Sequence, residues 1–152
     1  MRRKIRIDSS FKFDLIKATF NSEYLEDGGL IYGRFNEDTI KLFKLSDAGP
    51  KSIRKKFSIE FDNVFIKEFT NKMLLEGFYL FGTWHTHPEN SSLNLSNLDV
   101  KTICSFGGQY PDCFKPLFII TNISNGSFNY RIYEYKSDNI NLVNDKYIVW
   151  EE

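Results

Sequence analysis

Apolar residues recur along this chain with two different periods. Phe11, Leu15, Ile16 and Phe20 follow the spacing of one face of an α-helix. Such spacing predicts helices over residues 10–22 and about 61–76, and a capping box predicts a third from residue 96 to about 105. Alternating or continuous apolar stretches predict strands, which we place at residues 4–7, 28–35, 39–45, 57–61, 78–87, 117–121, 128–135 and 140–150. This mixture predicts an α/β (α+β) fold with a mixed sheet and flanking helices.

Turn and cap residues divide the predicted elements. Asn125-Gly126 is a strong signal for a two-residue hairpin turn between the strands on either side of it. Gly77 is placed to end the second helix. Ser96 and Asp99 have the spacing of a capping box that opens the third helix, with Asp in place of Glu. The chain has no repeat or linker, so we predict a single domain over residues 1–152.

Composition narrows the classes of partner. The chain has 152 residues, of which 41% are hydrophobic, enough for a packed core. Twenty basic and twenty acidic residues cancel, which argues against nucleic acid or a membrane surface as a partner. No apolar run reaches the roughly 18 residues of a membrane helix, so we expect a cytoplasmic protein. Cys104 and Cys113 are expected to be free thiols, because two cysteines without a C-x-x-C spacing form no disulfide framework.

The two histidines of the chain stand two positions apart, in Trp84-His85-Thr86-His87-Pro88. On a strand, residues i and i+2 share one face, with Cα atoms roughly 6.5 Å apart. Two imidazoles at this spacing can bind one metal ion. Pro88 cannot donate to a sheet ladder and should end the strand just after the pair. The alternative is that both histidines have a structural role and bind no metal.

A catalytic zinc site commonly needs a third protein ligand and leaves a further position for water. Asp99 is the acidic residue best placed for this role, in the first turn of the helix after the histidine strand. Zinc lowers the pKa of its bound water to about 7, which makes a nucleophile available at neutral pH. We therefore predict one Zn²⁺ ion held by His85, His87 and Asp99.

Two more residues are candidates for the chemistry. Glu26 precedes a Gly-Gly strand that could pack beside the histidine strand, and it could act as the general base. Glu23 and Asp27 compete for that role. Ser96 could donate a hydrogen bond to a tetrahedral oxyanion. The alternative reading makes Glu26 a surface residue and Ser96 and Asp99 no more than a helix cap.

Three segments together resemble the signature of the JAMM metalloproteases, also called MPN-plus or JAB domains. That signature is a glutamate before a glycine-rich strand, then His-x-His-Pro, then Ser-x-x-Asp. The matching segments lie in the expected order at residues 26–33, 84–88 and 96–99. The resemblance implies zinc ligation by His85, His87 and Asp99, with Glu26 as general base and Ser96 as stabiliser of the intermediate. It also implies a curved mixed sheet flanked by helices, like that of cytidine deaminases.

Many members of that family cleave bonds after the C-terminus of ubiquitin or a ubiquitin-like protein. The sequence of residues 82–88 is most similar to that of compact prokaryotic JAB proteins. Some of these are encoded beside ubiquitin-activating-like enzymes in antiphage or mobile-element operons. The resemblance thus implies a ubiquitin-like substrate or conjugate, and activating or conjugating enzymes as possible partners. Oligomeric state is left open.

The chain departs from the family pattern in the loop after the histidines. Eight residues separate His87 from Ser96, where about seven are expected, and Leu95 stands where many members have proline. Two other functions compete with the peptidase reading. One is a scaffold of the same fold without metal, although such domains lose ligands that this chain keeps. The other is a zinc hydrolase of a small molecule, although the Pro-Cys-x-x-Cys motif of zinc deaminases is absent.

Overall fold

A computed structural model describes residues 2–22 and 24–152 of the chain. The helices are α1 (Ser9–Asn21), α2 (Asn63–Leu75), α3 (Asn97–Gly107) and the short 3₁₀ helix η1 (Asp145–Tyr147). The strands are β1 (Lys4–Ile7), β2 (Gly28–Asn36), β3 (Thr39–Leu45), β4 (Ile53–Arg54), β5 (Ile59–Glu60), β6 (Tyr79–Thr86), β7 (Leu117–Ser124), β8 (Ser127–Lys136), β9 (Asn139–Leu142) and β10 (Ile148–Trp150).

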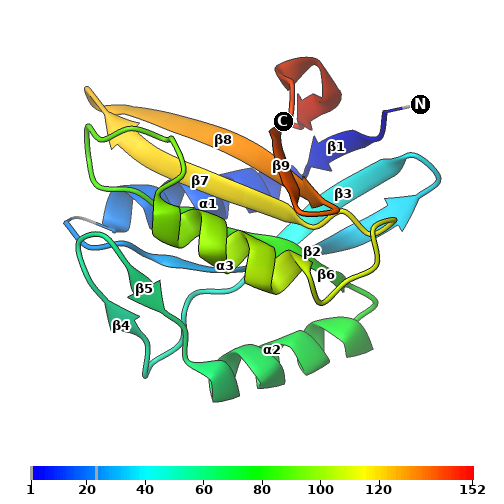
Figure 1. Ribbon diagram of the computed structural model, residues 1–152, viewed down its shortest axis with the longest axis horizontal. Coiled ribbons are helices and arrows are strands. Elements are labelled where there is room, and N and C mark those ends of the chain that lie inside the picture. The colour runs from blue at the N-terminus through cyan, green and yellow to red at the C-terminus, as the bar shows by residue number, and fades with distance from the viewer. Residues whose placement is uncertain (1, 23) are drawn as a thin grey trace.

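Eight of these strands form one mixed, curled sheet in the order β10-β1-β3-β2-β6-β7-β8-β9 (Figure 1). The histidine strand β6 lies near the middle, antiparallel to β2 and parallel to β7. Strands β4 and β5 pair with each other and form a separate hairpin. The predicted α+β class is confirmed.

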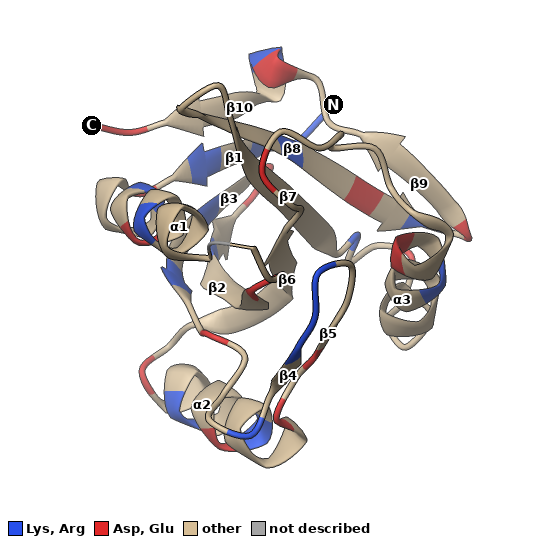
Figure 2. Ribbon diagram, turned by 90° about the vertical axis from the view of Figure 1, so that its left-hand side faces the viewer, with Lys and Arg blue, Asp and Glu red and all other residues tan. Residues whose placement is uncertain are grey.

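Alternate residues of the central strands point into two cores on opposite faces of the sheet, as the period of two requires. On β7, Leu117 and Ile119 pack in the core beneath α1. Phe118 and Ile120 face the other way and pack with Ile103 of α3. Figure 2 shows α1 and α3 on opposite sides of the sheet, with α2 and the hairpin below them.

Glycines bring β2 close to β6. Gly28 pairs with His85, and a Cβ atom at Gly28 would lie 2.6 Å from the carbonyl oxygen of Trp84 and 3.0 Å from the Cβ atom of His85. A side chain at this position would therefore force the two strands apart. The prediction that the Gly-Gly strand packs beside the histidine strand is confirmed, and Glu26 is brought to the same end of the sheet as the histidines.

Two of the predicted strands are wrong in extent. The segment 140–150 is not one strand, because the side chain of Asn144 accepts a hydrogen bond from the backbone N–H of Lys146 at 3.0 Å and caps η1. It gives β9, antiparallel to β8, and β10, parallel to β1 at the opposite edge of the sheet. The segment 57–61 is in strand conformation only at β5, and its partner β4 was not predicted.

The remaining boundaries differ from prediction by a few residues. Strand β6 ends at Thr86, and His87 follows it directly, with its backbone N–H donating to Thr121 at 2.8 Å. Asn125 and Gly126 both have positive φ, at 52° and 77°, as the predicted two-residue turn requires. Cys104 and Cys113 are free thiols, as expected. No helix among the described residues is long and apolar enough to span a membrane.

Candidate metal centre

Three side chains converge where β6 ends and α3 begins. His85 Nε2 lies 3.1 Å from Asp99 Oδ1, and His87 Nε2 lies 3.0 Å from Asp99 Oδ2. The two Nε2 atoms are 3.3 Å apart. Each side chain offers one ligand atom to a shared space. The structure therefore brings together the three residues that the sequence predicted as metal ligands.

Local structure fixes Asp99 in this position. Ser96 is the N-cap of α3, and its hydroxyl oxygen accepts a hydrogen bond from the backbone N–H of Asp99 at 3.0 Å. In return, Asp99 Oδ2 accepts from the backbone N–H of Ser96 at 2.9 Å. This reciprocal capping box, predicted from the sequence, orients the carboxylate before it meets either histidine.

The hydrogen bonds of His87 define which of its nitrogen atoms faces the cluster. His87 Nδ1 lies 2.8 Å from the carbonyl oxygen of Ser92, which can only accept, so Nδ1 carries a proton and donates it. In a neutral ring, Nε2 then presents its lone pair to the Asp99 carboxylate. Two electron-rich atoms at 3.0 Å require a cation between or beside them, either a proton or a metal ion.

The spacing of the three ligand atoms suits a metal ion. Four-coordinate zinc with bonds of 2.0–2.1 Å has ligand atoms about 3.3 Å apart. The two histidine Nε2 atoms are 3.3 Å apart, and each lies 3.0–3.1 Å from a different oxygen atom of the Asp99 carboxylate. Burial would raise the pKa of Asp99, but its close interactions with the His85 and His87 side chains outweigh burial and hold that pKa well below its usual value. Asp99 is therefore the ionised ligand that a divalent cation needs.

Glu26 lies beside the cluster with its side chain almost entirely buried, at 6% relative exposure. The pKa of Glu26 is raised to about 7, chiefly by burial. The charge of His87 opposes this rise, and the charge of Asp99 adds to it. A carboxyl group that titrates near neutral pH can both accept and release a proton there, which is the property of a general base that later acts as an acid.

The competing carboxylates are differently placed. Asp27 Oδ1 accepts from the backbone N–H of Gly28 at 2.9 Å and lies 3.8 Å from Arg54. These contacts tie the Asp27 carboxylate to the first residue of β2 and to the hairpin. Glu23 lies outside the described residues. Glu26 lines a cavity together with His85 and Asp99, and Asp27 does not.

That cavity has a volume of about 240 Å³ and opens onto the cluster. Its apolar lining comes from the hairpin and from α3 and includes Phe57, Ile59, Leu98 and Ile103. Phe57 and Leu98 are exposed at 68% and 52%, which is unusual for apolar side chains beside a polar centre. The cavity can therefore accommodate a small or largely apolar segment of an extended peptide next to Glu26.

Ser96 lies at the edge of this arrangement. It is exposed and does not line the cavity. Its hydroxyl oxygen accepts a hydrogen bond from the backbone N–H of Asp99. A hydroxyl group that accepts in this way can still donate its hydrogen to another group. The structure thus places Ser96 as the helix cap that the sequence predicted, in direct contact with Asp99.

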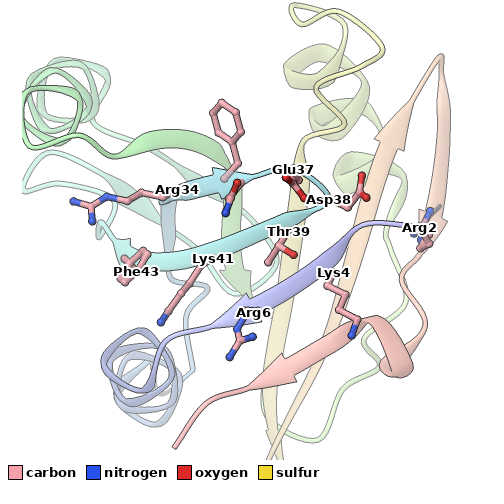
Figure 3. Close-up of a pocket in the computed structure, with 11 residues that line it drawn as sticks. Arg2, Lys4, Arg6, Arg34, Glu37, Asp38, Thr39, Lys41 and Phe43 are labelled. Carbon is pink, nitrogen blue, oxygen red and sulfur yellow. The ribbon is translucent and has the colours of Figure 1, made fainter.

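A larger cavity, of about 730 Å³, lies away from the cluster on the outer face of β1, β2 and β3 (Figure 3). Lys4, Arg6, Arg34 and Lys41 project from this face. Glu151 lies 2.6 Å from both Arg6 and Lys41, so these cations are already paired. This face is an ion-paired sheet surface, without the convergent ligands that His85, His87 and Asp99 provide.

Sequence reasoning missed the parts of the site that act through the backbone. The carbonyl of Ser92 orients His87, and Arg54 of β4 holds the segment that carries Glu26. A carbonyl group is common to every residue, so no sequence signal marks Ser92. Arg54 stands in the short basic run Arg54-Lys55-Lys56, which has the form of a solvated surface segment and does not indicate a contact with Glu26.

Comparison with known proteins adds support for the fold. No family model and no curated protein matches the sequence. Among solved structures, the chain is similar to the solution structure of protein DSY2949 from Desulfitobacterium hafniense, with a TM-score of 0.76 and 15% identity. The match covers 97% of this chain and 93% of that one. At this identity the likeness extends to the fold alone.

Proposed function

We propose that this protein is a zinc-dependent isopeptidase or peptidase that cleaves after the C-terminus of a ubiquitin-like protein. The observation that carries the proposal is the convergence of His85, His87 and Asp99 beside a buried Glu26. The resemblance to JAMM proteases, with its curved cytidine-deaminase-like sheet, supports the choice of reaction. The proposal includes a cytoplasmic location and ubiquitin-activating-like enzymes as partners.

His85, His87 and Asp99 are the residues that would hold the zinc ion. Bound there, zinc would supply a Lewis acid and lower the pKa of water to about 7. Glu26 takes a proton from the attacking water molecule and delivers it to the nitrogen of the leaving amine, so that no free amide anion forms. General acid–base catalysis of this kind contributes about 10²–10⁴-fold. Ser96 donates its free hydroxyl hydrogen to the oxyanion.

The hairpin supports an extended peptide as the substrate. Strand β5 places Ile59 in the cavity wall, and β4 and β5 form a small two-stranded sheet of their own. An extended tail that adds to this small sheet would be held in register by main-chain hydrogen bonds while its scissile carbonyl faces the cluster. A flexible C-terminal tail of a ubiquitin-like protein has the required shape.

Two other functions make different demands on the same residues. A scaffold would need neither a set of metal ligands nor a buried carboxylate beside it. This chain has both the three candidate ligands and the buried Glu26. A small-molecule hydrolase would suit the cavity volume of about 240 Å³, but Phe57 and Leu98 in its lining are largely exposed, which favours a longer substrate. The peptidase proposal accounts for all of these features.

A panel of ubiquitin-like proteins tests the proposal, each as a linear C-terminal fusion and as a lysine conjugate. The zinc-loaded protein should cleave after the C-terminal residue of at least one of them, and Glu26→Gln should not. Zinc-loaded protein that binds a panel member without cutting it would establish the scaffold. Zinc-loaded protein that neither binds nor cleaves any member would contradict the proposed substrate class.

A further inference from the structure

The guanidinium group of Arg54 binds the segment that precedes β2. Arg54 Nε donates to the carbonyl oxygen of Glu26 at 2.9 Å, and Nη2 donates to that of Ser22 at 3.1 Å. Nη2 also lies 3.5 Å from the carbonyl oxygen of Leu25. One side chain thus holds three backbone carbonyls between the end of α1 and the start of β2.

The backbone of Glu26 is held from its other side as well. Its N–H donates to the carbonyl oxygen of Lys55 at 2.8 Å. Both backbone polar groups of Glu26 therefore bind consecutive residues at the end of β4. The segment has no strand or helix of its own at Glu26, so these contacts replace the hydrogen bonds of regular structure.

The same hairpin forms a wall of the cavity. Arg54 pairs with Ile59 of β5, and Ile59 lines the cavity beside Glu26. A hairpin of two-residue strands has little stability on its own. Its packing against the Glu26 segment and the position of Glu26 are therefore interdependent.

We infer that Arg54 is a positioning residue that holds Glu26 against the metal cluster by binding the carbonyls of the segment around it. The inference rests on the proposed function, in which Glu26 moves the proton. Arg54 does not line the cavity and is not one of the three candidate metal ligands. Its planar fork reaches several carbonyls at once, and the single ammonium group of lysine does not reproduce this.

The first test compares Arg54→Lys and Arg54→Ala with Lys55→Ala on a cleaved fusion. Lys55 is the matched control, because its exposed side chain can be removed while its carbonyl still binds Glu26. Both Arg54 variants should lower kcat by at least about tenfold and leave KM within about threefold, since a displacement of 1 Å costs up to 10²-fold. Zinc content should stay at one per chain, and Lys55→Ala should match wild type.

The second test does not depend on cleavage. In the full chain without zinc, the Glu26 carboxyl carbon is followed by NMR against pH and assigned with Glu26→Gln. Wild type should titrate near pH 7, and Arg54→Lys should titrate at least about one unit lower because the freed carboxylate gains water. Lys55→Ala should follow wild type.

The outcomes separate the two ideas. If wild type cleaves no substrate but Arg54→Lys shifts the Glu26 titration, the proposed function fails and the positioning role stands. If wild type cleaves and folded Arg54→Lys retains both wild-type kcat and the wild-type titration, the positioning role is wrong. Should Arg54→Ala fail to fold, the charge-conserving Arg54→Lys decides the matter.

Discussion

His87 and Ser92 are joined by a hydrogen bond of 2.8 Å between Nδ1 of the imidazole and the backbone carbonyl. The bond links the end of β6 to the loop that leads to α3. It fixes the ring orientation and leaves Nε2 as the atom available to a metal. The loop 88–95, with the unusual length noted from the sequence, thus contributes to the centre through its backbone.

This bond predicts the tautomer of His87 in the zinc-loaded protein. Nitrogen-15 NMR should show His87 with a protonated Nδ1 and a metal-bound Nε2, because the carbonyl of Ser92 cannot donate. His87→Ala should lower zinc affinity by more than about 10²-fold, since it removes a ligand outright rather than an outer contact. Exposed Glu89→Ala, two residues away, is the matched control. A ring protonated at Nε2 in the presence of zinc would contradict this geometry.

Burial of Glu26 predicts how stability depends on pH without metal. Its pKa is raised from 4.5 to about 7 in the folded chain, so the folded state binds the proton more tightly than the unfolded state. The stabilisation is present below pH 4.5 and is lost as pH rises towards 7. Between pH 5 and pH 8, wild type should lose about 2 kcal/mol more stability than Glu26→Gln.

Chemical denaturation with a chelator present, at both pH values, measures this difference. Glu89→Gln is the control, because it removes an exposed carboxylate near the centre and should follow wild type. Parallel pH dependence of wild type and Glu26→Gln would mean that Glu26 is solvated.

Ser96 has two roles that substitutions can separate. As N-cap it accepts a hydrogen bond from Asp99, and in the proposed reaction it donates one. Ser96→Asp keeps a good cap but has no hydrogen to donate, so it should fold normally and lose about 10²–10³-fold in kcat. Ser96→Thr keeps both roles and should remain active. Equal kcat for the Asp and Thr variants would reduce Ser96 to a helix cap.

The sequence predicted that the three candidate ligands converge because each lies in or beside an element with a recognisable pattern. The strand period puts His85, near the end of β6, and His87, just after it, on one face, and Ser96-x-x-Asp99 marks the first turn of α3. The Gly-Gly pair indicated a close approach of strands, and the clash that a Cβ atom at Gly28 would make with Trp84 gives the reason. Short-range periodicity and capping chemistry were sufficient for these residues.

Other features depend on contacts that leave no local pattern. Strand β4 has only two residues, too few for a period, and it forms because β5 and the Glu26 segment meet it. The segment 140–150 is apolar enough for one strand, but the side-chain cap at Asn144 divides it between both edges of the sheet. These outcomes follow from tertiary contacts and not from propensity.

The central claim is that three ligands and one buried carboxylate form a hydrolytic zinc centre. Zinc content and cleavage of a ubiquitin-like fusion, measured together on wild type and Glu26→Gln, test it most directly. We predict one zinc per chain in both proteins, cleavage by wild type that a chelator abolishes and zinc restores, and a loss of at least about 10²-fold in Glu26→Gln. Wild-type rates in Glu26→Gln, or cleavage that persists without zinc, would contradict it.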